Sequence, residues 1–210
     1  ENVSIYLSLS LIIPLLALIV NYSKTAATKE NKEPVFSVLI SFAFLVFGIT
    51  NVLQIISSVS NLTPIISLTN FEYSVRYGYM YSLILILIPF VYYLVPKIYG
   101  REFTYGRLEA FNAYLLGISV VATLSLNALI GINSGFSWNA GANAGNPTIY
   151  GEGFLITWSL ISTPYTLILF LSLLFLLSTF LFTLSTLKAI ISGSVTESET
   201  VLEVPGDSYE

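Results

Sequence analysis

The sequence contains no cysteine and no histidine, and Met80 is its single methionine. These side chains supply most protein ligands for zinc, copper, iron–sulfur clusters and haem, and histidine is the usual proton shuttle near neutral pH. We therefore expect this chain to bind no haem, copper or other metal by itself, so any such cofactor would belong to a partner subunit. The absence of cysteine also excludes disulfides and thiol chemistry.

Charged residues are also scarce, at 10% of the chain against 55% hydrophobic residues. Soluble domains carry about 25% charged residues and about 45–50% apolar ones. The charges are confined to short segments between long apolar runs, which indicates a chain whose solvent is the lipid bilayer. Nucleic-acid binding is not expected, because it needs a clustered basic face that this sequence does not have.

Five apolar runs predict an all-α integral membrane protein, a bundle of five transmembrane helices. Each run is long enough to cross about 30 Å of hydrocarbon at about 1.5 Å per residue. The last run is longer than a bilayer needs, so we expect it to tilt, bend near Pro164 or extend into water. The short apolar piece 62–68 is expected to lie at the interface. The five runs cover residues 4–22, 35–58, 73–95, 108–132 and 154–190.

The distribution of basic residues predicts the orientation. With five spans, seven of the eight basic residues fall on one side, and Arg76 lies toward the other. The positive-inside rule then places the N-terminus outside and the C-terminus in the cytoplasm, in the cell membrane. The transmembrane domain is expected over residues 1–191, followed by an acidic, flexible cytoplasmic tail at 192–210. The seven residues are Lys24, Lys29, Lys32, Lys97, Arg101, Arg107 and Lys188.

Segments outside the runs carry further expectations. The chain begins at Glu1 rather than at methionine, so we expect a preceding segment to have been removed, and we interpret the first run as a true span. Sequons at Asn2 and Asn61, both expected outside, are candidates for glycosylation.

Residues 133–153 are rich in glycine and asparagine and predict an irregular outer loop. Trp138 in that loop is a candidate contact with a neighbouring subunit, or part of an entrance.

The interiors of the five runs carry no Asp, Glu, Lys or Arg at mid-membrane depth, which argues against a proton pump or an ion-coupled transporter. Asn51, Gln54 and Asn127 lie within the runs, and we expect them to make hydrogen bonds between helices rather than to bind a substrate. The pattern contains no phosphate-binding loop and no pair of nucleophile and base. We therefore predict no catalytic, cofactor-binding or metal-binding residue.

The most unusual local sequence lies at the outer end of the third run, where four tyrosines surround Arg76 and Gly78. Tyrosines at this depth are typical of the aromatic belt of a membrane protein, and Glu72 lies one helical turn before Arg76, where the two can pair. The alternative is a contact with a quinone headgroup or a haem propionate. The tyrosines are Tyr73, Tyr77, Tyr79 and Tyr81.

The segment 92–108, YYLVPKIYGREFTYGRL, resembles the inner loop that follows the tenth helix in the catalytic subunit of haem–copper oxidases and nitric oxide reductases. The run that follows, with Leu115, Leu116 and Gly117, is similar to the start of the eleventh helix of that family. Helices eight to twelve of that subunit also cross the membrane in alternating directions, starting from the outside, as the five runs are expected to do here. The matching residues are Tyr92, Tyr93, Leu94, Val95, Pro96, Lys97, Gly100 and Arg101.

In that family the tenth helix carries two histidines, one residue apart, that ligate the two haems. Counting back from Pro96 without gaps places these positions near Ser74 and Arg76, and neither residue replaces an axial imidazole. The resemblance thus implies a non-catalytic accessory subunit of a respiratory terminal oxidase, including the quinol-oxidising kind, or of a related electron-transfer complex. Such a subunit packs against the catalytic subunit, with haem and copper in the partner.

Four other interpretations stay open at this point. The resemblance could arise by chance, or the chain could be half of a split catalytic subunit, although that would require haem ligands in the third run. From other functional classes, the chain could be a small transporter or channel for a neutral solute, with a path lined by Asn, Ser, Thr and Tyr. It could also be a membrane scaffold or envelope protein that forms a homo-oligomeric lattice.

Overall fold

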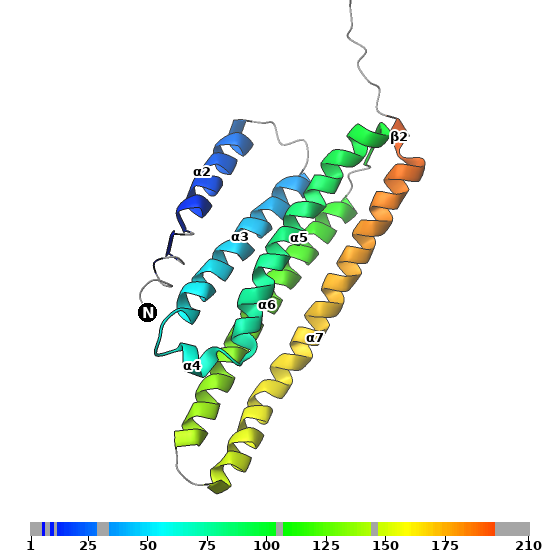
Figure 1. The fold of residues 1–210 in the computed structure, drawn as a ribbon. Coiled ribbons are helices and arrows are strands. Elements are labelled where there is room, and N and C mark those ends of the chain that lie inside the picture. The colour runs from blue at the N-terminus through cyan, green and yellow to red at the C-terminus, as the bar shows by residue number, and fades with distance from the viewer. Residues whose placement is uncertain are drawn as a thin grey trace, which may run out of the picture.

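The computed structural model describes residues 6, 9–10, 12–28, 34–103, 107–143 and 147–195. Within these residues the chain forms long helices that run up and down side by side in chain order (Figure 1). A one-turn helix, α4 (Thr63–Ile66), lies between the second and third of them. The long helices are α2 (Ile12–Thr28), α3 (Pro34–Ser57), α5 (Asn70–Tyr99), α6 (Arg107–Asn143) and α7 (Pro147–Ser192).

Four helices are long and apolar enough to cross a membrane, which supports a multi-pass membrane protein. They comprise Val35–Ser57, Asn70–Tyr99, Arg107–Ser137 and Ser162–Ser192. The first helix, α2, is apolar over Ile12–Lys24 but shorter. Its 17 residues span about 25 Å, slightly less than the hydrocarbon thickness of about 30 Å. Length and composition therefore support four of the five predicted crossings, and α2 is the helix that they do not support.

The predicted irregular loop at 133–153 is wrong. Helix α6 continues to Asn143, and α7 begins at Pro147, where the missing N–H and fixed φ of proline suit the first turn of a helix. A glycine within a helix costs only about 1 kcal/mol relative to alanine, so packing can outweigh it. Helices α6 and α7 form the most extensive helix pair of the described chain.

Helix α7 also passes through Pro164 without interruption. Of the three expectations for this long run, extension beyond the bilayer fits best, because 46 helical residues span about 69 Å. At the other end of α7, strand β2 (Ser194–Val195) pairs antiparallel with β1 (Arg101–Glu102), which follows α5. The tail from residue 196 onward lies outside the described residues.

The core lies between α3, α5 and α6, whose facing side chains are almost completely inaccessible. Glycines let these helices approach closely, as small residues do at helix contacts in membranes. A Cβ atom at Gly78 of α5 would overlap Thr50 of α3, and one at Gly131 of α6 would overlap the backbone of Phe71. The largest fully buried core side chains include Leu39, Val46, Phe71, Leu85, Leu116, Val120 and Leu124.

Polar side chains join the helices where the sequence analysis expected them to, with one exception. Asn70 Nδ2 of α5 donates to Asn127 Oδ1 of α6 at 3.2 Å, and the Tyr79 hydroxyl of α5 donates to Asn51 Oδ1 of α3 at 3.3 Å. The interhelical role is therefore confirmed for Asn51 and Asn127. Gln54 differs, because its amide donates within its own helix, to Ser57 Oγ at 3.4 Å.

Helix α7 is held to α6 by a reciprocal pair of side chains. The Ser178 hydroxyl donates to Asn112 Oδ1 at 2.6 Å, and Asn112 Nδ2 donates to the Ser178 carbonyl at 3.1 Å. Both residues are buried. Because lipid offers no alternative partners for these groups, the pair fixes the register of α7 on α6.

The substitution Gly131→Ala should destabilise the bundle by about 1–3 kcal/mol, the usual cost of overpacking, because the backbone of Phe71 cannot move aside cheaply. Gly48→Ala is the matched control, since its Cβ would lie 3.8 Å from Leu15 Cδ2, an ordinary contact. The control should equal the parent or exceed it by up to about 1 kcal/mol. Thermal unfolding in detergent, followed by circular dichroism, measures both. A Gly131→Ala protein as stable as the parent would contradict the packing.

Candidate binding pocket beside Arg76

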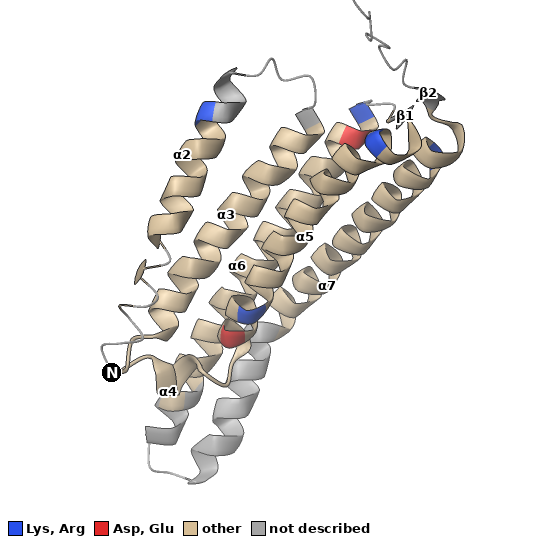
Figure 2. Ribbon diagram, turned by 45° about the horizontal axis from the view of Figure 1, so that its top comes forward, with Lys and Arg blue, Asp and Glu red and all other residues tan. Residues whose placement is uncertain are grey.

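The charged residues of the described chain gather at the two ends of the bundle (Figure 2). One end holds Glu72 and Arg76, close together at the start of α5. The opposite end carries the other charged residues of the described helices, near the ends of α2, α5 and α7 and at the start of α6. These are Lys24, Lys97, Arg107, Glu109 and Lys188.

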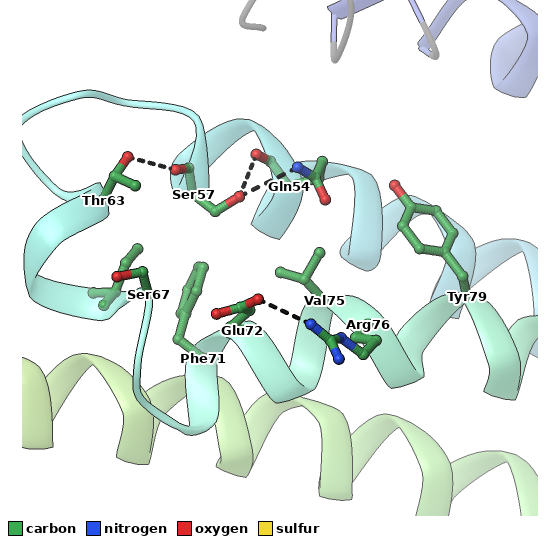
Figure 3. Close-up of a pocket in the computed structure, with 10 residues that line it drawn as sticks. Gln54, Ser57, Thr63, Ser67, Phe71, Glu72, Val75, Arg76 and Tyr79 are labelled. Atoms are coloured by element: carbon green, nitrogen blue, oxygen red, sulfur yellow. Dashed lines mark hydrogen bonds and ion pairs between the residues drawn. The ribbon is translucent and has the colours of Figure 1, made fainter.

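A pocket of about 480 Å³ opens beside Arg76, between α3, α4 and α5 (Figure 3). Hydrogen-bonding side chains from three elements face it, over apolar side chains from the start of α5. The pocket beside Arg76 is lined by Gln54, Ser57, Thr63, Ile66, Ser67, Phe71, Glu72, Val75, Arg76 and Tyr79.

Local sequence explains why these residues meet. The Thr63 hydroxyl donates to the carbonyls of Ser57 and Val59, at 2.8 and 2.9 Å, which folds the α4 turn back onto the end of α3. Thr69 then caps α5, since its extended backbone ends the turn and its side-chain oxygen accepts from the Phe71 N–H at 3.2 Å. Starting α5 at this point places Glu72 and Arg76 on the pocket face.

The ion pair predicted from the sequence is confirmed, with 3.2 Å between Arg76 NH2 and Glu72 Oε1. The two side chains are 74% and 50% exposed, so in water the pair would contribute at most about 1 kcal/mol. Glu72 also lies in the first turn of α5, where the helix dipole favours a negative charge. The guanidinium has five N–H donors, and one contact to Glu72 leaves others for a ligand.

The hydroxyls of this pocket are engaged in local hydrogen bonds. The Ser57 hydroxyl donates to the Gln54 carbonyl at 2.8 Å and the Thr63 hydroxyl to backbone carbonyls, so neither is paired with a base. Among the described residues, no group of three or more His, Cys, Asp or Glu could hold a metal ion. The pocket lining combines a cation, an anion and an amide with the apolar side chains of Phe71 and Val75. This combination suits the polar head of an amphiphile.

The four tyrosines of the sequence analysis do not form one site. Tyr73 and Tyr77 stack with ring centroids 4.0 Å apart and are largely exposed, as in an aromatic belt. Tyr79 turns toward α3, with its ring edge on Phe47 at 5.7 Å. Tyr81 turns toward α7, with its ring edge on Phe175 at 5.7 Å. Helical periodicity thus distributes them over different faces of α5.

The two residues at the family's haem-ligand positions, Ser74 and Arg76, also lie on different faces of α5. Ser74 is only 2% exposed, and its hydroxyl donates to the Asn70 carbonyl at 3.1 Å. It lies one turn before Gly78 on the same face, where α5 meets Thr50 of α3. Arg76 lies in the pocket on another face. Protein atoms therefore occupy the surroundings of Ser74, while Arg76 is open to solvent or headgroups.

The segment that carries the family resemblance has a clear local structure. Gly100 ends α5 with a left-handed backbone, φ 61°, and its N–H donates to the Pro96 carbonyl at 2.9 Å, a glycine C-cap. Phe103 is buried against Tyr92 at 4.4 Å between ring centroids, and Tyr92 meets Phe182 of α7 at 5.2 Å. Gly100 thus has a role in helix termination, and Tyr92 has a role in aromatic packing.

Comparison with known proteins adds no relative to this picture. No family model, no curated protein and no solved structure matches the chain. Functional inference therefore rests on the residues themselves.

Sequence reasoning identified Arg76, Glu72 and Tyr79 but missed the opposite wall of the pocket, formed by Gln54, Ser57, Thr63 and Ser67. That wall depends on α4 folding back onto α3, which is a tertiary feature. The local signals were Pro64 at the start of α4 and the capping Thr69.

Two substitutions should separate the structural part of the pocket from its exposed part. Tyr79→Phe removes the donor to Asn51 and should lower the free energy of unfolding by about 0.5–1.5 kcal/mol. Arg76→Gln should change it by no more than about 0.5 kcal/mol, because the ion pair is exposed. Tyr114→Phe on α6, at a half-exposed tyrosine, is the control for loss of a hydroxyl. Thermal unfolding in detergent measures all three, and the reverse order for Tyr79→Phe and Arg76→Gln would refute these assignments.

Proposed function

We propose that this chain is a non-catalytic membrane subunit of a respiratory terminal oxidase of the haem–copper type, including the quinol-oxidising kind, or of a related electron-transfer complex. Its role is to pack against the catalytic subunit and stabilise it, while haem and copper belong to that partner. The observation that carries the proposal is the uncovered apolar face of α7.

Helix α7 packs chiefly against α6, and most of its other surface is uncovered between residues 162 and 192. Between residues 162 and 192, Ser178 and Ala189 are its two buried residues, whereas α6 buries more than half of its most apolar stretch. The exposed leucines and phenylalanine recur every three or four residues, so they form one stripe, and such a stripe suits knobs-into-holes packing against another helix. The α7 stripe consists of Leu169, Leu173, Leu176, Phe180, Leu184 and Leu187.

The choice of a terminal oxidase, rather than another membrane complex, comes from the resemblance of residues 92–108. The loop at residues 92–108 and the proposed alternation in helix direction resemble those of the second half of that family's catalytic subunit. The absence of histidine from the whole chain makes a non-catalytic role the consistent one.

A channel for a neutral solute has less support. The centre of the bundle between α3, α5 and α6 is filled by apolar side chains, and Tyr92, Phe103 and Phe182 pack together at the end of α5 remote from Arg76. A path through the chain would have to displace these groups. A channel or a scaffold formed by several copies is an alternative outcome of the co-purification experiment described below.

The proposed topology has five crossings, with the N-terminus outside and the C-terminus in the cytoplasm. It is supported by the gathering of basic residues at the end remote from Arg76, as the positive-inside rule requires (Figure 2). Asn61, at the same end as Arg76, is then on the outside and accessible to glycosylation. Asn2 lies outside the described residues.

The topology can be tested with single cysteines, because the chain has none of its own. Leu68→Cys, at a 98% exposed position after α4, should react with a membrane-impermeant maleimide added to intact cells. Lys24→Cys, at the opposite end, should react only after permeabilisation. Labelling of Lys24→Cys but not Leu68→Cys in intact cells would show the inverted orientation.

The partner can be tested by purification from native membranes in mild detergent. A haem-bearing partner should co-purify, seen by haem absorbance and by native mass spectrometry. Leu176→Trp on the α7 stripe should reduce the recovered partner at least several-fold by steric clash. Leu87→Trp, at a half-exposed position on α5, is the control and should not reduce it. A chain that runs alone or only with its own copies, without haem absorbance, would overturn the proposal.

A further inference from the structure

A second pocket lies between α5, α6 and α7, on the side of α5 opposite the pocket beside Arg76. It has a volume of about 300 Å³ and adjoins a smaller cavity of about 40 Å³ that shares Tyr81, Thr123 and Ser172. None of the side chains lining either space carries a charge. The Thr123 pocket, taken as both spaces, is lined by Asn70, Tyr73, Tyr81, Val120, Thr123, Asn127, Tyr165, Ile168, Ser172 and Phe175.

The hydroxyl of Thr123 is the most informative group in this pocket. Thr123 is 6% exposed, and the part of the chain that the structure describes offers its Oγ1 no hydrogen-bond partner. Its backbone carbonyl is already used, accepting from Asn127 Nδ2 at 2.9 Å. A buried hydroxyl without a partner costs about 1–3 kcal/mol, and lipid cannot satisfy it. The Thr123 hydroxyl is therefore available to donate a hydrogen bond to a molecule in the pocket.

The lining restricts the chemistry of that molecule. With no cation or anion in the walls, a charged ligand would lose its hydration without gaining a counter-ion, so the ligand is neutral. The hydroxyls of Thr123 and Ser172 can each donate to an acceptor such as a carbonyl oxygen. Tyr81 and Phe175, in edge contact with each other, form an aromatic wall that suits a flat ring.

The depth of the pocket adds a further restriction. From Asn70 to Tyr81 the pocket follows eleven residues of α5, about 16 Å, and its inner end lies about 8 Å deeper in the bilayer than Arg76, which is at the level of solvent or headgroups. A ligand that reaches Thr123 must therefore be soluble in the bilayer. A ring that is neutral, flat, lipid-soluble and rich in carbonyl acceptors is a quinone ring.

We propose that the Thr123 pocket binds the ring of a neutral, lipid-soluble quinone, with one quinone carbonyl accepting a hydrogen bond from Thr123 Oγ1. The proposal concerns binding, and it requires no electron transfer by this chain. It rests on the contacts among α5, α6 and α7 and does not depend on the identity of any partner subunit.

The test uses the full chain in phosphatidylcholine nanodiscs, titrated with a decyl-substituted benzoquinone and compared with empty nanodiscs. The parent chain should bind about one quinone per chain with saturation. Thr123→Val keeps nearly the same volume but removes the donor, so its affinity should fall about 2- to 10-fold, the range of one net hydrogen bond. Ser125→Ala, two residues away on α6 and outside the pocket lining, is the control and should bind as the parent does.

A second variant keeps the test decisive if Thr123→Val does not fold. Ser172→Phe fills the pocket from α7 and should abolish saturable binding. No saturable binding by the parent chain would mean that water or lipid fills the pocket, and it would overturn the proposal. Equal affinity of the parent and Thr123→Val would overturn the role of the hydroxyl. Quinone binding without any haem-bearing partner would leave this inference intact while refuting the proposed function.

Discussion

Close approach of α5 to α3 and α6 is the constraint on which the rest of this structure depends. Lipid tails give no hydrophobic drive for helices to associate, so packing at small residues and hydrogen bonds between helices must supply it. Gly78 and Gly131 allow that approach, and the Tyr79–Asn51 and Asn70–Asn127 bonds fix the register. Once α5 is fixed in this way, its two opposite faces have different environments.

Those two faces give the molecule its asymmetry. At the Arg76 end, the face toward α3 and α4 carries an exposed ion pair in an open pocket, and the face toward α6 and α7 carries a neutral pocket that reaches into the bilayer. At the opposite end, α5 is closed by the cap at Gly100 and by Phe103. The pocket beside Arg76 and the Thr123 pocket therefore lie at the end that carries the fewest basic residues.

Sequence patterns predicted the helical class and the approximate positions of the long helices, because twenty-residue apolar runs have few other structures in a bilayer. They failed where tertiary contacts decide. The glycine-rich stretch 133–153 is largely helical because α6 and α7 support each other, and α5 begins three residues before the expected Tyr73 because Thr69 caps it. The far wall of the pocket beside Arg76 was not predicted, since Pro64 and Thr69 mark the turn but not its contact with α3. The burial of Thr123 was not predictable, since nothing local distinguishes it from other threonines.

The central claim is that the uncovered face of α7 belongs to an interface with a catalytic, haem-bearing subunit. A cryo-electron microscopy map of the assembly purified from native membranes tests this most directly. The expected map places the α7 stripe, from Leu169 to Leu187, against a helix of a subunit that contains haem. A map in which lipid alone, or a second copy of this chain, surrounds α7 would contradict the claim.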